Sequence, residues 1–150
     1  GGNTAVNGPA FSAYIDAGIA AQSITSGSQQ KVLFTLEEYD TNNNFASSRF
    51  TPTVAGYYQL NATVRFDGAT GTGEQMIVLY KNGAEYKRGW NAQGVQWATG
   101  WWSMSVNSTA YANGSTDYFE IYVQQGNGGS LTLTRGAAIS WFNGCMIRGA

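Results

Sequence analysis

The stretch that decides the fold is residues 56–66, which read Gly56-Tyr57-Tyr58-Gln59-Leu60-Asn61-Ala62-Thr63-Val64-Arg65-Phe66. Apolar and polar side chains alternate along it with a period of two, the period of a β-strand with one buried face. One face carries Tyr58, Leu60, Ala62, Val64 and Phe66, and the other carries Tyr57, Gln59, Asn61, Thr63 and Arg65. The pattern predicts a half-buried antiparallel strand.

The rest of the chain repeats this signal in short runs that are separated by turns. Asn82-Gly83 lies between two apolar runs and predicts a hairpin, because its turn needs positive φ twice. Further strands are expected at 32–36, 76–80, 85–88, 101–106, 119–123, 131–134 and 139–147. Helix signals are nearly absent, since the best candidate is short and contains Gly18. We expect one all-β domain of about nine to ten antiparallel strands, a sandwich or jelly roll.

The composition excludes several classes of protein. Among 150 residues there is no His, which removes Ser-His-Asp and Cys-His catalysis and His-ligated metals. The single Cys145 excludes an internal disulfide and a Cys-cluster metal site. The 8 scattered basic residues do not predict a nucleic-acid binder, and no run of about 18 apolar residues predicts membrane insertion. We expect no cofactor.

What remains is a polar, glycine-rich and aromatic chain. Ser, Thr, Asn and Gln number 47, Gly adds 20, and charged residues are only 11%. A surface wetted by hydroxyls and amides is typical of extracellular or virion domains. We therefore expect a protein located on a virion surface or outside the cell.

One spaced pattern is specific enough to suggest a family. It runs through Phe34, Asp40, Phe45, Phe50, Gly56, Tyr58 and Leu60. The pattern resembles the signature of the complement component 1q globular head, within the tumour necrosis factor-like jelly-roll superfamily. The chain departs from it in the shorter spacing between Phe45 and Phe50, and in Leu60 and Ala62, where the family usually has aromatic residues.

Other landmarks agree in order along the chain. Residues 9–13 look like the opening strand, 79–83 like the central hairpin, 113–117 like the Gly-Asp turn and 142–144 like the closing strand. The resemblance implies a jelly-roll head domain over residues 9–150, with 1–8 a tag remnant or a linker to a stalk. The style of the sequence looks like bacteriophage or bacterial members of the superfamily.

The resemblance also implies a homotrimer, in which an inner sheet packs around a threefold axis. The expected interface residues are Tyr57, Gln59, Asn61, Trp101, Ser103, Trp141 and Asn143. Large rings beside amides and hydroxyls on one sheet face suit a protein–protein interface. The alternative is that these aromatic side chains fill gaps under loops.

A second aromatic group suggests a ligand. Residues 90–102 hold four of the five tryptophans. Trp and Tyr on polar loops stack on sugar rings or anchor protein partners. The candidate binding residues are Tyr86, Trp90, Gln93, Gln96 and Trp97. The alternative is that these rings pack against the outer sheet.

Other chemistry-bearing residues favour structural roles. Asp40 to Asn44 offers oxygens for calcium but lacks spaced carboxylates, so a polar loop is favoured and no metal is expected. Glu37 and Glu38 point to opposite faces of a strand, so no catalytic acid pair is indicated. We expect Cys145 to be a small buried side chain.

These observations predict a non-catalytic trimeric head domain of a virion fibre, either a tail or a head fibre tip. Such a domain would attach to a host-surface glycan or protein, and three copies would multiply weak sites. The alternatives are a secreted lectin or cytokine-like recognition domain and a purely structural trimerisation knob. A polysaccharide hydrolase is a further alternative, which two carboxylates facing one cleft would favour.

Overall fold

The computed structural model describes residues 7–150, without the side chains of residues 69–72 and 95–99. This part of the chain forms eleven strands and no helix, so it contains no helix that could cross a membrane. The strands are β1 (Ala10–Tyr14), β2 (Ser23–Ile24), β3 (Gln30–Lys31), β4 (Leu36–Asp40), β5 (Phe45–Ala46), β6 (Arg49–Phe50), β7 (Gly56–Lys81), β8 (Ala84–Ala112), β9 (Phe119–Gln125), β10 (Leu131–Leu133) and β11 (Trp141–Gly149).

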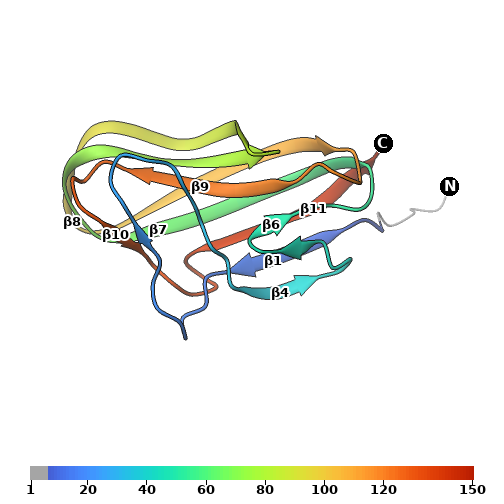
Figure 1. The fold of residues 1–150 in the computed structure, drawn as a ribbon, viewed down its shortest axis with the longest axis horizontal. Coiled ribbons are helices and arrows are strands. Elements are labelled where there is room, and N and C mark those ends of the chain that lie inside the picture. Colours follow the sequence, from blue (N-terminus) through green and yellow to red (C-terminus); the bar gives the residue numbers. More distant parts are fainter. Residues whose placement is uncertain (1–6) are drawn as a thin grey trace.

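The strands form two antiparallel layers (Figure 1). The layer that we call the inner sheet has the order β4-β1-β11-β7-β8, with residues 56–66 of β7 and 102–112 of β8. The outer sheet joins residues 84–92 of β8 and 75–81 of β7 to β9, which also pairs with β3 and β6. β7 and β8 therefore run through both layers and curl around together at one end of the molecule.

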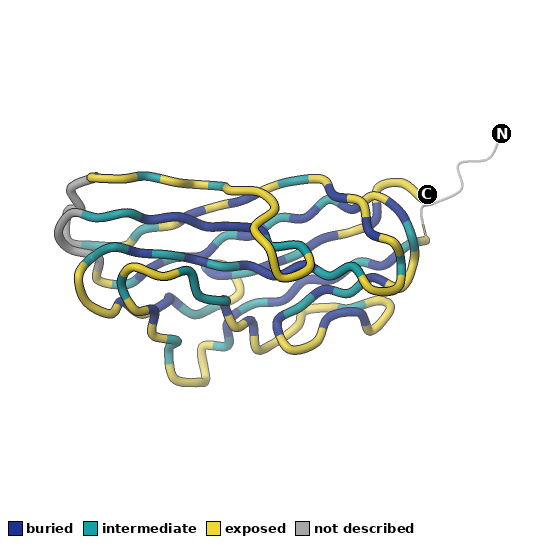
Figure 2. The backbone as a smooth tube through the Cα atoms, turned by 45° about the horizontal axis from the view of Figure 1, so that its top comes forward, coloured by how far each residue is buried: buried dark blue, intermediate teal, exposed yellow. Residues whose placement is uncertain are grey.

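The core lies between the two layers. Tyr58, Leu60, Ala62, Val64 and Phe66 are at most 1% exposed, as their alternation predicts. Figure 2 shows buried and less buried positions alternating along the long strands.

Most of the spaced aromatic residues of the sequence pattern join this core. Phe34, Phe45 and Phe50 are buried, and Phe11 stacks on Phe50 with ring centroids 4.2 Å apart. Phe142 from the last strand meets Phe11 edge-on at 4.9 Å. The aromatic residues of the pattern in β5 and β6 therefore pack in the core against Phe11 of β1 and Phe142 of β11.

The predicted hairpin is confirmed at Asn82-Gly83, where φ is 54° and 78°. Two other expectations need correction. Residues 32–35 lie between β3 and β4 and do not form a strand, because Val32 N–H bonds the Ile121 carbonyl while Phe34 N–H bonds the Ser48 hydroxyl, and no ladder continues. Only Leu36 of the expected strand is in one, as the first residue of β4. The last strand begins at Trp141 rather than at 139, because Ser140 N–H turns back to the Gly136 carbonyl.

Candidate functional site

The candidate site is the outward face of the inner sheet, which we call the open face. It consists of the outward side chains of β1, β11, residues 57–65 of β7 and residues 101–111 of β8. The register sets the rows of this face: Tyr14–Trp141–Thr63–Ser105, then Ser12–Asn143–Asn61–Asn107, then Ala10–Cys145–Gln59–Thr109. Three of these strands, β7, β8 and β11, thus bring the seven predicted interface residues onto one surface.

The middle of the open face is a row of amides. Asn143, Asn61 and Asn107 lie directly opposite one another on three strands. The Asn61 amide donates to Asn143 Oδ1 at 3.2 Å and accepts from Gln59 Nε2 at 3.0 Å. Side-chain amides that bond to each other in this way still have donors and acceptors to offer to a second surface.

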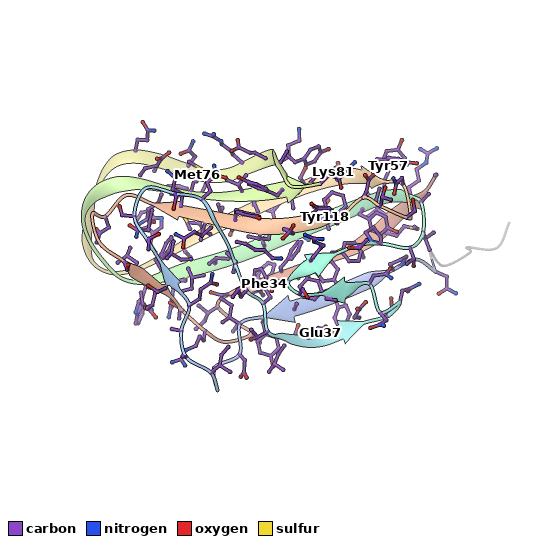
Figure 3. All side chains as sticks on the ribbon, in the orientation of Figure 1. Phe34, Glu37, Tyr57, Met76, Lys81 and Tyr118 are labelled. Carbon is purple, nitrogen blue, oxygen red and sulfur yellow. The ribbon has the colours of Figure 1, made fainter. Side chains whose placement is uncertain are left out.

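One end of the open face is apolar. Tyr57, Tyr111 and Ile147 are 45%, 41% and 46% exposed, and the two tyrosine rings lie 5.4 Å apart. Together with Arg148 and the C-terminal residues, they line a hollow of about 640 Å³. In Figure 3 the labelled Tyr57 lies at the end of the molecule where the C-terminus lies.

The opposite end of the open face carries Trp101. It is 71% exposed, the highest value among the large apolar side chains that the structure describes. The Arg65 guanidinium lies over its ring at 4.5 Å, a cation–π contact that orients the indole. Ser103 beside it is exposed, whereas Trp141 is half-buried in the row of Tyr14 and Thr63.

The expectation that Cys145 is buried is wrong in this chain. Its neighbours Gly144 and Met146 point inward, so Cys145 points outward onto the open face and is exposed. The alternation of the strand outweighs the preference of cysteine for burial.

The predicted ligand residues lie along β8, away from the core. Tyr86 and Trp90 are 38% and 43% exposed, and Gln93 is exposed. The Trp90 ring also contacts the Trp102 ring, with centroids 5.6 Å apart, so it is part packing residue and part surface residue. The side chains of Gln96 and Trp97 lie outside the described residues.

The carboxylates near the loops hold the backbone in place. Asp40 accepts hydrogen bonds from the N–H groups of Asn44 and Phe45, at 2.9 and 2.7 Å. The Asn82 amide, the Asn113 N–H and the Lys81 ammonium stabilise the charged form of Asp117, which lowers the pKa of that carboxyl. Among the described residues, no group of His, Cys, Asp and Glu side chains is arranged to hold a metal ion.

Sequence reasoning missed a charged cluster on the outer sheet. Glu120 is buried and is paired with Lys31 at 2.6 Å and with Arg49 at 3.1 Å. The Arg49 guanidinium lies over the Tyr118 ring at 3.8 Å. Local sequence patterns could not reveal this cluster, because its residues come from three different strands, β3, β6 and β9. The one signal in the sequence was the acidic Glu120 inside the apolar run 119–123.

Comparison with known proteins identifies the fold. No protein-family model matches the chain, and no curated protein matches it. Among solved structures, murine APRIL at pH 8.0 superposes with a TM-score of 0.64 and 11% identity, over 93% of this chain and 98% of that chain. Eiger TNF from S. frugiperda superposes with a TM-score of 0.66 and 9% identity, over 96% of both chains.

Likeness at this level of identity shows the fold alone. The chain is an all-β, tumour necrosis factor-like jelly roll, as the spaced aromatic pattern predicted.

Proposed function

We propose that this chain is a homotrimeric, non-catalytic recognition domain whose open face is the subunit interface. The observation that carries the proposal is the exposure of Trp101, Tyr57, Tyr111 and Ile147 on that one face. Soluble monomers rarely expose large apolar side chains at both ends of one sheet face, whereas interfaces are enriched in Trp and Tyr.

A closed ring of three copies fits the features of this face. A cyclic trimer buries the same face of every copy through a heterologous contact that closes after three rotations. The amide row of Asn61 and Asn143 would pair with amides of neighbouring copies, so that the buried polar groups stay hydrogen-bonded. The family that the sequence resembles is also built of homotrimers.

The trimer is tested by its mass in solution and by charge substitutions. Light scattering should give about three times the 16.1 kDa of one chain. Tyr57→Asp and Trp101→Asp should each reduce that mass to one chain, because a carboxylate would be left unpaired in an apolar contact. Ile19→Asp is the matched control, since Ile19 is 40% exposed in the loop between β1 and β2 and is not part of a strand of the open face. A single-chain mass for the unchanged protein would contradict the proposal.

The finer form of the proposal is attachment by a virion fibre tip to a host-surface glycan or protein. The polar, glycine-rich composition without His supports it. The exposed rings of Tyr86 and Trp90 on the edge strand offer a contact surface for each copy. Trp90→Ala should weaken binding to host cells while the protein remains trimeric, and unchanged binding would remove this patch from the proposal.

The alternative is a secreted lectin or cytokine-like ligand, which the fold likeness to Eiger TNF favours. The sequence that surrounds the domain in its gene distinguishes the two. A phage shaft favours the fibre, and a collagen-like Gly-X-Y tract favours the secreted protein. If host-cell binding is absent altogether, the domain is a structural trimerisation knob.

A further inference from the structure

A polar hollow of about 470 Å³ lies beside the charged cluster of the outer sheet, and we call it the β5–β6 pocket. Lys31, Asn43, Ser47, Arg49, Thr51 and Thr53 are among its lining residues. They come from β3, from the loop that precedes β5, from the β5–β6 hairpin and from the segment after β6. None of them belongs to the open face or to the Tyr86–Trp90 patch, so the pocket is separate from both.

The charges at this pocket are not balanced. Lys31 and Arg49 share one carboxylate, Glu120, whose side chain is only 3% exposed. The side chains of Lys31 and Arg49 are 24% and 42% exposed, so both cations also reach solvent. Two cations around one buried anion leave one positive charge at the pocket wall. The nearby carboxylate of Asp40 is turned toward the N–H groups of Asn44 and Phe45.

The pocket is also rich in hydrogen-bond donors. Lys31 and Arg49 carry several N–H groups each; both pair with Glu120, and the Arg49 guanidinium also lies over the Tyr118 ring. Ser47 and Thr51 add hydroxyl groups, and Asn43 adds an amide. Such a wall favours a ligand with anionic oxygen atoms that also carries hydroxyl groups.

Backbone strain is concentrated at the same place. Among the described non-glycine residues, four have positive φ, and three of them are Asn43, Ser47 and Ser48, at 54°, 53° and 58°. The Ser48 hydroxyl is held by two hydrogen bonds: it accepts one from Phe34 N–H at 2.9 Å and donates one to the Phe34 carbonyl at 3.2 Å. Asn43 and Ser47 are exposed at the wall of the pocket.

Glycine would adopt these angles without strain. Ser47 and Ser48 are the two central residues of the β5–β6 hairpin, a turn that requires positive φ, so the hairpin itself accounts for their angles and places the Ser47 side chain at the pocket wall.

A second hollow continues the first. It shares Lys31 and Ser47 with the β5–β6 pocket and extends past Phe34 to Glu37, both labelled in Figure 3.

From the charge and the hydrogen-bond donors of its wall we infer that the β5–β6 pocket binds an acidic saccharide. Its carboxylate would pair with Lys31 and Arg49, and its hydroxyl groups would bond Asn43, Ser47 and Thr51. This inference deepens the proposed recognition function, on which it rests, by naming a site and a ligand class.

The test is a titration of the ¹⁵N-labelled protein with sodium glucuronate, followed by NMR chemical shifts. Shifts that saturate at residues 43–53 are expected, and glucose at equal concentration should cause none there. Equal shifts with glucose would overturn the acidic preference, and no shifts with either sugar would overturn the site. Sodium sulfate that reproduces the glucuronate shifts would also overturn it, because the pocket would then bind a simple ion.

Substitutions make the test specific. Lys31→Gln should raise the Kd for glucuronate at least fivefold, and Lys87→Gln, which changes the net charge equally on β8, should leave it unchanged. Ser47→Gly should weaken binding without lowering the melting temperature, since glycine relieves the strain at that position. Equal Kd values for the unchanged protein, the Lys31 variant and the Ser47 variant would refute the assignment.

The oligomeric state separates this inference from the proposed function. Glucuronate binding by a single-chain species would retain the pocket and refute the trimer. A trimer without glucuronate binding would refute the pocket alone.

Discussion

At the scale of single residues, Gly89 marks the place where the edge of β8 comes closest to the inner sheet. A Cβ atom there would fall within contact distance of the Ser105 carbonyl and 2.6 Å from the Val106 Cβ. Gly89→Ala should therefore lower the free energy of unfolding by about 1–3 kcal/mol, as overpacking does. Urea denaturation measures the change.

The matched control is Gly129→Ala, where a Cβ meets nothing within 4 Å. Its effect should stay within about 0.5 kcal/mol. Equal changes in the free energy of unfolding for the two substitutions would show that the close approach at Gly89 does not restrict the size of the side chain there.

Tyr58 connects the core to the pH dependence of stability. Burial raises the pKa of Tyr58 to about 12, from the 10.0 that is ordinary for tyrosine, and its hydroxyl donates to the Val54 carbonyl at 2.6 Å. A raised pKa means that the fold prefers the neutral form. This contribution to stability is complete below pH 10 and is lost as the pH rises toward 12.

The urea midpoint should therefore fall between pH 10 and 12. Tyr58→Phe should be less stable at pH 7, by about 1 kcal/mol for the lost hydrogen bond. It should also lose less stability over the alkaline range, because it has no hydroxyl to ionise at position 58. The loss that remains would come from Tyr80 and Tyr122, whose pKa values burial also raises. Parallel alkaline curves for the two proteins would contradict this account.

At the scale of elements, Asp117 ties the β7–β8 hairpin to the turn before β9. It accepts hydrogen bonds from Asn82 Nδ2 at 2.7 Å and from Asn113 N–H at 3.0 Å, and it pairs with Lys81 at 3.2 Å. Asp117→Asn should cost about 1–2 kcal/mol at pH 7, since hydrogen bonds to a charged group are the stronger ones.

The stabilisation by the Asp117 carboxylate depends on pH, in a direction that its lowered pKa determines. The pKa of Asp117 is lowered, so its contribution is present above the ordinary carboxyl pKa of about 4 and is lost as the pH falls through the folded value. The difference in the urea midpoint between the two proteins should shrink steadily below pH 4. A difference in urea midpoint that persists at pH 2 would mean that the charge of Asp117 is not what stabilises the turn.

The elements also show what the sequence could and could not predict. Alternation over 56–66 determined both faces of that strand, because the period of a strand is a local property. The strand prediction for residues 32–36 was wrong because Val32 and Phe34 are buried although their backbone N–H groups bond to β9 and to the Ser48 hydroxyl rather than to one strand. The β5–β6 pocket was missed because its cations and its carboxylate are brought together by tertiary pairing.

At the scale of the whole molecule, the sequence predicts which side chains of each strand point onto the open face, but their alignment across the face depends on how the strands pair. The outward positions of Tyr57, Gln59 and Asn61 follow from strand parity. Their alignment with Trp101 and Asn143 depends on the register between β11, β7 and β8. The family resemblance supplied that order before any register was known.

Assembly through this face should make stability depend on protein concentration. When three folded copies dissociate as they unfold, each tenfold rise in concentration adds about 0.9 kcal/mol per chain, which raises the Tm by about 2–4 °C. Differential scanning calorimetry at two concentrations measures the shift. Tyr57→Asp should lower the Tm and abolish its concentration dependence, whereas Ile19→Asp should keep that dependence. A Tm of the unchanged protein that is independent of concentration, together with a single-chain mass, would mean that the open face stays in water and that the trimer does not form.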